Sequence, residues 1–89
     1  MLKDDDLKTI INIAKDFNVK RVWLFGSALS EDSEPNDIDL AVEGVPHSQF
    51  FTLYGKLMFA LPLMVDLVDL NDDLSIASII REKGKVIYG

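Results

Sequence analysis

Apolar residues recur along the chain with two different spacings, and the longer spacing predicts three helices. Between about Asp5 and Phe17 they return every three or four residues, with polar residues between them, which is typical of an amphipathic helix. A second helix is expected to begin at Pro46, and its apolar positions are Phe50, Tyr54, Leu57, Met58 and Leu61. Residues 71–73, Asn-Asp-Asp, are N-cap candidates for a last helix that runs through Ile80.

Shorter apolar runs predict strands between these helices. Residues 21–25, RVWLF, are rich in β-branched and aromatic side chains and end at Gly26. Residues 37–42, DIDLAV, form a second strand, and PLMVDLVDL, which begins with Pro62, forms a third. After Gly84, KVIY adds a short edge strand. The order α-β-β-α-β-α(-β) predicts an α/β (α+β) fold, with one small mixed sheet and the helices packed on one face.

Length and composition predict one globular unit. The chain has 89 residues, 48% of them apolar, which suffices for one core and predicts a single domain over residues 1–89. It has no cysteine, so disulfides and thiolate zinc sites are excluded. The N-terminus lacks the apolar segment of a signal peptide. Residues 57–65 are apolar but interrupted by Pro62, and they fall far short of the ~20 residues of a membrane helix. We therefore expect a cytoplasmic protein without a membrane partner.

The charge of the chain bears on its ligands. The net charge is −6 and the pI about 4.5. Tight binding to duplex nucleic acid depends on lysine and arginine side chains that neutralise phosphates, so this charge argues against it. A polyphosphate ligand would have to be neutralised locally, through a metal ion.

Two aspartates stand inside the second strand, where apolar residues are expected. Residues two apart in a strand point to the same face, so Asp37 and Asp39 project side by side. The residues that point the other way, into the helices, are Ile38, Leu40 and Val42. Two like charges this close raise each other's pKa unless a cation lies between them. Because hard oxygen ligands suit Mg²⁺ or Mn²⁺, the pair predicts a divalent metal site.

Gly26 and Ser27, directly after the first strand, complete this candidate site. A glycine lets the backbone approach a ligand closely, and Ser27 can donate both its N–H and its hydroxyl to a phosphate oxygen. Each signal alone is weak, because exposed strand faces often carry acids and Gly-Ser is usually a turn. The combination with a later apolar-Asp-apolar strand is much rarer. It predicts a phosphate-binding loop beside carboxylates that hold the neutralising metal.

The third strand offers two candidates for a further carboxylate, Asp66 and Asp69. They are three residues apart, so on a regular strand they face opposite sides. If Asp66 shares the face of the first two aspartates, its neighbours Val65 and Leu67 point into the core. Asp69 then lies at the end of the strand, where it reaches solvent or the N–H groups after Asn71. The reverse register would bury Asp66 unpaired beneath the helices, so we predict Asp66 on the active face.

This arrangement resembles the DNA polymerase beta-type nucleotidyltransferase superfamily, and the length resembles its minimal nucleotidyltransferase (MNT) branch. The pattern of the superfamily is hG[GS], then [DE]h[DE]h, then a later h[DE]h, where h is apolar. The matching segments are Phe25-Gly26-Ser27, Asp37-Ile38-Asp39-Leu40 and Val65-Asp66-Leu67. The resemblance spans essentially the whole chain, including its closing segment IIREKGKVIYG.

The resemblance implies metal-dependent transfer of an NMP unit from an NTP, with ATP as the expected donor, to a hydroxyl, while pyrophosphate leaves. It implies that Asp37, Asp39 and Asp66 are catalytic residues and ligands of Mg²⁺ or Mn²⁺. Asp66 would be the general base or a ligand of a second metal ion. Gly26 and Ser27 would bind the nucleotide. Many minimal members are antitoxins of helical HEPN-domain toxins, and some AMPylate the toxin, so a HEPN-type partner is implied as well.

The loop after the first strand departs from the family pattern. Family members often read G-S-R-A-R-G there, with arginines near the phosphates, whereas residues 26–31 read GSALSE. The acids Glu31, Asp32 and Glu34 should oppose a triphosphate. A second hypothesis therefore stays open, in which the chain is a catalytically weak or inactive module that neutralises a helical partner by binding alone.

The remaining aromatic residues are assigned to packing. Trp23 is expected in the core. Helical spacing favours core or a partner surface, rather than a base-stacking platform, for Phe50, Phe51, Tyr54 and Phe59.

Overall fold

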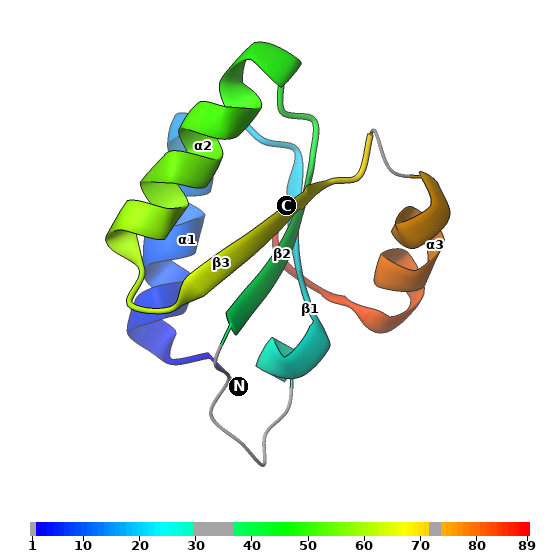
Figure 1. Ribbon diagram of the computed structural model, residues 1–89, viewed down its shortest axis with the longest axis horizontal. Helices are drawn as coiled ribbons and strands as arrows, with labels where there is room; N and C mark the ends of the chain where they lie inside the picture. The colour runs from blue at the N-terminus through cyan, green and yellow to red at the C-terminus, as the bar shows by residue number, and fades with distance from the viewer. Residues whose placement is uncertain (1, 30–36, 72–73) are drawn as a thin grey trace.

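The computed structural model describes residues 2–29, 37–71 and 74–89, which form helices around a central sheet (Figure 1). In chain order the elements are α1 (Asp4–Asp16), β1 (Arg21–Phe25), the 3-10 turn η1 (Gly26–Leu29), β2 (Asp37–Glu43), α2 (His47–Ala60), β3 (Met64–Asp69), α3 (Leu74–Lys83) and β4 (Lys85–Tyr88). The predicted fold class and element order are confirmed, including the short strand at KVIY.

The described strands form one mixed sheet in the order β3-β2-β1-β4. β1 is antiparallel to both β2 and β4. β2 and β3 are parallel, which requires a crossover, and α2 provides it. The edge strands are therefore β3 and β4.

The main core lies between the sheet and the helices α1 and α2, which cover one face (Figure 1). Alternate strand residues point into it because side chains in a strand alternate between faces. The strand residues of this core are Val22, Leu24, Ile38, Leu40, Val42, Val65 and Leu67. Ile10 and Ala14 of α1 and Leu53 and Leu57 of α2 pack against them.

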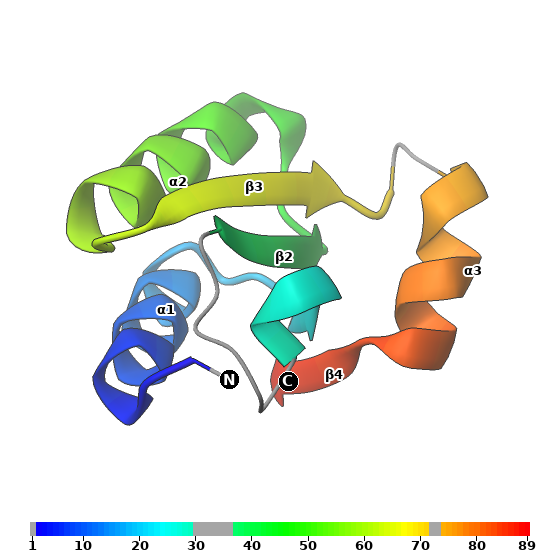
Figure 2. The same ribbon diagram turned by 60° about the horizontal axis from the view of Figure 1, so that its bottom comes forward.

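Helix α3 corrects the expectation that all helices pack on one face. A second cluster, made of Ala41, Leu70, Ala77 and Ile80 with Trp23 partly buried against it, lies on the opposite face. The two views agree that α3 is separated from α1 and α2 by the strands (Figures 1 and 2). The cause is the sequence of that face, which is apolar at one end, with Trp23 and Ala41, and acidic at the other, with Asp37 and Asp39. Helix α3 covers the apolar end.

A polar cluster around Glu43 anchors α3 to the apolar end of the sheet. Glu43 is buried and accepts a hydrogen bond from the Trp23 indole nitrogen at 2.7 Å. Arg21 and Arg81 approach its carboxylate at 3.6 Å and 3.5 Å. Burial alone would raise the pKa of Glu43, but the Trp23 hydrogen bond and the charges of Arg81 and Arg21 hold it below its ordinary value. Trp23, expected in the core, is only half-buried, and its N–H serves this cluster.

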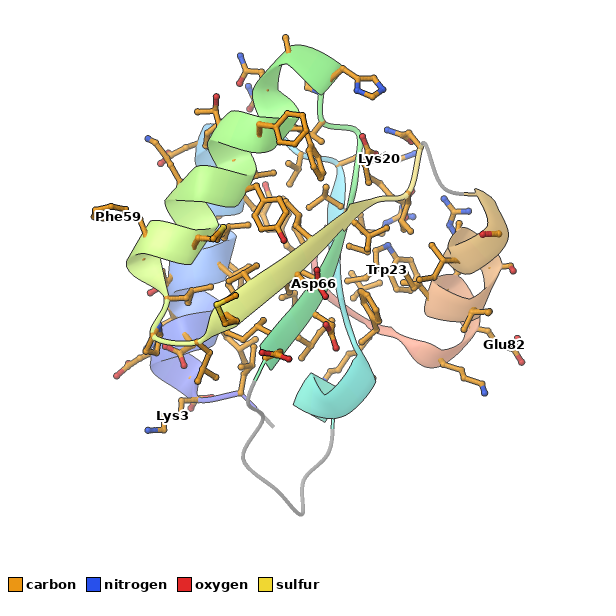
Figure 3. All side chains as sticks on the ribbon, in the orientation of Figure 1. Lys3, Lys20, Trp23, Phe59, Asp66 and Glu82 are labelled. Atoms are coloured by element: carbon orange, nitrogen blue, oxygen red, sulfur yellow. The ribbon has the colours of Figure 1, made fainter. Side chains whose placement is uncertain are left out.

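Helix α2 departs from its predicted apolar face at Met58. The buried residues of the helix are Leu53 and Leu57, whereas Met58 is 48% exposed. Met58 is uncovered because β3 is an edge strand, and no further strand lies beyond it among the described residues. Phe51 and Phe59 are exposed at 79% and 98%, and Phe59 points away from the sheet (Figure 3).

Several predicted boundaries also shift, most of them by one residue. The third strand begins at Met64 rather than at Pro62, and α3 continues past Ile80 to Lys83. Of the expected N-cap candidates, Asp72 and Asp73 lie outside the described residues. Within residues 2–29, 37–71 and 74–89, no helix is long and apolar enough to cross a membrane.

Candidate active site

The acidic end of the sheet brings the three predicted carboxylates to one face. Along β2, the exposed Asp37 and the half-buried Asp39 alternate with the buried Ile38 and Leu40. The parallel register between β2 and β3 places Asp66 opposite Asp39. Asp66 is exposed and lies on the same face, on the side away from α1 and α2 (Figure 3). We call this end of the sheet, with Asp37, Asp39 and Asp66, the carboxylate end.

The register of β3 is the one predicted from its sequence. Val65 and Leu67, on either side of Asp66, are buried in the main core. Asp69 lies on their side of the strand and is only 8% exposed. Its Oδ1 accepts the backbone N–H of Asn71 at 3.0 Å, in the turn that precedes α3. Asp69 is therefore a turn-stabilising residue, remote from the carboxylate end.

Gly26 brings the loop after β1 into contact with Asp39. Its φ is +70°, a conformation that L side chains rarely adopt. A Cβ built on Gly26 would clash with Oδ2 of Asp39, so the carboxylate rests directly against the backbone of this residue. Ser27 follows in η1, whereas the acids Glu31, Asp32 and Glu34 lie outside the described residues. The predicted loop and the predicted carboxylates thus meet at Gly26 and Asp39.

The negative charges at the carboxylate end repel one another. Burial raises the pKa of Asp39, and the neighbouring charges of Asp66 and then Asp37 raise it further. A cation bound among the three carboxylates would reverse this effect, because an opposite charge favours the ionised form.

The chemistry of these carboxylates suits a divalent metal ion that is bound jointly by the protein and a substrate. Within the described residues, no three acidic or histidine side chains converge closely enough to hold an ion by themselves. Mg²⁺ is seldom held in an all-protein cage and usually keeps waters and substrate phosphate oxygens as ligands. Carboxylates on an open sheet face, with Asp37 and Asp66 exposed to solvent, suit that mode of binding.

Sequence reasoning missed a hollow of about 190 Å³ beside these carboxylates. It is lined by Asp37, Tyr54, Met58, Met64, Val65 and Asp66. The Tyr54 hydroxyl donates to the Val65 carbonyl at 2.9 Å, which fixes α2 over the edge of β3. Met64 pairs with Asp37 in the parallel register of β2 and β3. A prediction of that register from the sequence would have placed Met64 beside the carboxylates.

Comparison with known proteins defines the class. Residues 8–89 match the family model described as polymerase beta, nucleotidyltransferase. The chain therefore belongs to the polymerase beta nucleotidyltransferase family, as its motifs indicated. No curated protein gives a significant match.

Solved structures place the chain near a particular group within this class. A crystal structure of a toxin–antitoxin with AMP-PNP is 30% identical, with a TM-score of 0.76, over 93% of this chain and 73% of the other. A structure of the tri-AMPylated HEPN toxin of Shewanella oneidensis in complex with MNT antitoxin contains a chain that is 28% identical, with a TM-score of 0.76. The match covers 99% of this chain and 73% of that one. A crystal structure of the toxin–antitoxin MntA–HepT is 27% identical, with a TM-score of 0.74, over 98% of this chain and 73% of the other. The resemblance to MNT antitoxins inferred from the motifs is confirmed.

Proposed function

We propose that this chain transfers an NMP unit, AMP when ATP is the donor, to a hydroxyl of a HEPN-type toxin and thereby acts as an antitoxin. One observation carries the proposal: Asp37, Asp39 and Asp66 share one face of adjacent strands, beside Gly26, in a chain of the nucleotidyltransferase family. We further expect it to act in the cytoplasm, which stays a prediction.

The carboxylate end would bind the nucleotide together with a metal. Asp37, Asp39 and Asp66 would hold Mg²⁺ or Mn²⁺, which when bound supplies the positive charge that offsets the phosphates. Gly26 lets the backbone approach the triphosphate, and Ser27 would donate its N–H to a phosphate oxygen. Because Asp39 touches Gly26, the nucleotide phosphates would lie on the β1 side of the carboxylates.

The transfer itself would need one proton acceptor. The carboxylate of Asp66 takes the proton of the acceptor hydroxyl, and the hydroxyl oxygen attacks the α-phosphorus of the nucleotide. A new ester bond forms between this oxygen and the α-phosphorus. The bond from the α-phosphorus to the oxygen bridging to the β-phosphate breaks, and its electron pair leaves with pyrophosphate.

The similar structures support the choice of donor and acceptor. One contains AMP-PNP, an analogue of ATP. In another the HEPN toxin carries three AMP groups and is bound to an MNT antitoxin. A donor of AMP and a toxin acceptor are therefore the natural choices for this chain.

A second function, neutralisation by binding alone, is favoured by the phosphate loop. Residues 26–31 read GSALSE, without the arginines found in many relatives, and the net charge of the chain is −6. Weak attraction of a triphosphate would lower catalysis but would leave a toxin-binding surface intact.

Label transfer separates the two functions. The purified protein would be mixed with the product of the adjacent gene, α-labelled ATP, and either Mg²⁺ or a chelator. We expect the two proteins to elute as one complex and the partner to gain label only with Mg²⁺. Toxin neutralisation within an intact complex that never gains label would instead establish the binding-only function.

A further inference from the structure

The carboxylate end needs positive charge that the loop after β1 does not supply. Residues 26–31 contain no lysine or arginine, and the carboxylates of Asp37, Asp39 and Asp66 would repel a triphosphate. The chain has nine lysine and arginine residues, and all of them lie within the described residues. Their places in the fold decide which of them can reach a nucleotide at this end.

Most of these cations are engaged elsewhere or lie far from the carboxylates. Arg21 and Arg81 pair with Glu43. Lys56 lies over the Phe17 ring, 5.7 Å from its centroid. Four more belong to α1 and its flanking residues, across the sheet from the carboxylates or at its other end: Lys3, Lys8, Lys15 and Lys20. Two lysines near the C-terminus remain.

These two residues, Lys83 and Lys85, flank Gly84 between α3 and β4, and we call this segment the lysine turn. Both lysines are exposed, and the ion pairs among the described residues include neither. The Gly84 N–H donates to the Ile80 carbonyl at 2.6 Å, and a Cβ on Gly84 would lie 3.2 Å from the Leu24 carbonyl. Backbone contacts therefore hold the lysine turn against β1.

The strand register places the lysine turn at the carboxylate end. Asp66 pairs with Asp39, and Asp39 pairs with Phe25. Phe25 directly precedes Gly26, and Lys85 pairs with the residue before Phe25. Neighbouring strands lie ~4.8 Å apart, so β4 begins about 10 Å from Asp39, on the far side of β1. Both views show η1 beside the lysine turn (Figures 1 and 2).

This position suits the outer phosphates of a donor nucleotide. In the proposed reaction the α-phosphorus lies at the carboxylates and the phosphates lie on the β1 side, so the β- and γ-phosphates extend past Gly26 toward β4. Lys83 ends α3, which packs on the sheet face that carries the carboxylates. A lysine places a compact positive charge on a flexible four-carbon stem, which suits phosphate oxygens.

Helix stability accounts for only part of the lysine turn. A positive side chain in the last turn of a helix is stabilised by the helix dipole, and Lys83 occupies such a position in α3. Lys85 begins the following strand, where the dipole gives no such reason for a cation. A role in binding an anion explains both lysines.

We propose that Lys83 and Lys85 bind the β- and γ-phosphates of the donor nucleotide, in place of the arginines that the loop lacks. The inference rests on the proposed transfer and adds the residues that attract its triphosphate. The lysine turn then makes the chain favour a nucleoside triphosphate over a monophosphate.

Calorimetry with ATP or AMP in the presence of Mg²⁺ would test this assignment. The double variant Lys83→Gln/Lys85→Gln changes two exposed side chains, so the fold should survive. We expect its affinity for ATP to fall at least about tenfold, since charge-assisted hydrogen bonds to phosphate are lost. Its affinity for AMP should stay within about twofold, because AMP has no β- or γ-phosphate. Lys83→Arg/Lys85→Arg keeps both charges and should retain most of the ATP affinity.

The matched control is Lys8→Gln/Lys15→Gln, which removes the same charge from exposed positions of α1, across the sheet. It should bind ATP within about twofold of the wild-type affinity, because distant surface charges are screened. Equal losses in the two glutamine variants would overturn the proposal, since net charge alone would explain them. An unchanged ATP affinity in Lys83→Gln/Lys85→Gln, or an equal loss for AMP, would overturn it as well.

Label transfer by the wild-type protein separates this inference from the proposed function. ATP binding that depends on the lysine turn, without any transfer to the partner, would reject the transfer and leave the phosphate-binding role standing. Transfer that proceeds with wild-type ATP affinity in Lys83→Gln/Lys85→Gln would reject only the role of the lysines. A wild-type protein that binds no ATP would reject both.

Discussion

Asp39 lies at the point where the phosphate loop and the carboxylates meet. Its side chain is half-buried against Gly26, and Asp66 and Asp37 share its face. Burial and these two charges raise the pKa of Asp39 above the ordinary value of 3.8. The ionised form of Asp39 therefore destabilises the metal-free fold at neutral pH. A bound cation would relieve this destabilisation, because an opposite charge favours the ionised carboxylate.

Replacing this carboxylate should separate stability from binding. Asp39→Asn should raise the Tm of the metal-free protein at neutral pH, since it removes a charge that the fold disfavours. The gain should shrink as the pH falls through the raised pKa and vanish below the ordinary value of 3.8, where the wild-type group is neutral in both the folded and the unfolded state. Calorimetry should show that Asp39→Asn and the exposed Asp37→Asn both weaken Mg²⁺-dependent ATP binding. A lower Tm for Asp39→Asn at neutral pH would contradict this account of the site.

Gly26 is the other residue on which the site depends. Gly26→Ala would force an L residue to φ +70° and drive its Cβ into Asp39. We expect a loss of stability of about 1 kcal/mol or more, with loss of ATP binding. Gly55→Ala is the matched control, because a Cβ there meets nothing within 4 Å and the helix should gain about 0.5–1 kcal/mol. Chemical denaturation would measure both, and a neutral Gly26→Ala would show that the loop does not rest on Asp39.

At the level of elements, residue patterns predicted most of what positions the candidate site. The strand over residues 21–25 has the predicted bounds, and the odd spacing of Asp66 and Asp69 settled the face of β3. The predictions that failed depend on neighbours that no local pattern specifies. Met58 is exposed because β3 is an edge strand. Helix α3 crosses to the other face because the side chains there change from acidic to apolar along the strands.

The cluster around Glu43 should make the packing of α3 depend on pH. The folded pKa of Glu43 is lowered, so its contribution to stability is present above the ordinary value of 4.5 and is lost as the pH falls through the lowered value. Glu43→Gln should therefore lower the Tm at neutral pH, and the difference from wild type should shrink below pH 4.5. Glu82→Gln, an exposed change on α3, should have little effect. Thermal unfolding across this range checks the prediction, and a difference that grows in acid would refute it.

In the whole molecule, exposed apolar residues lie next to the acidic ones at the edge of the sheet. Phe51 and Phe59 lie exposed on α2, and Met64 begins the neighbouring strand β3. The carboxylate end opens beside them, and α3 covers only the opposite end of that face. The proposed transfer to a second protein is consistent with this arrangement, because a partner that covers the exposed apolar residues would bring its hydroxyl to Asp66.

The pair Asp66 and Asp69 allows the most direct measurement of whether the carboxylate end is the reaction centre. Both are aspartates of β3, but one lies on the open face and the other bonds the Asn71 N–H. Transfer of label from ATP to the partner would be followed for Asp66→Asn and Asp69→Asn, alongside ATP binding. We expect Asp66→Asn to lower transfer by about 100-fold or more while largely sparing ATP binding. Asp69→Asn should transfer nearly as well as wild type, since an amide oxygen can still accept that N–H. Loss of transfer in Asp69→Asn with activity retained in Asp66→Asn would contradict the site.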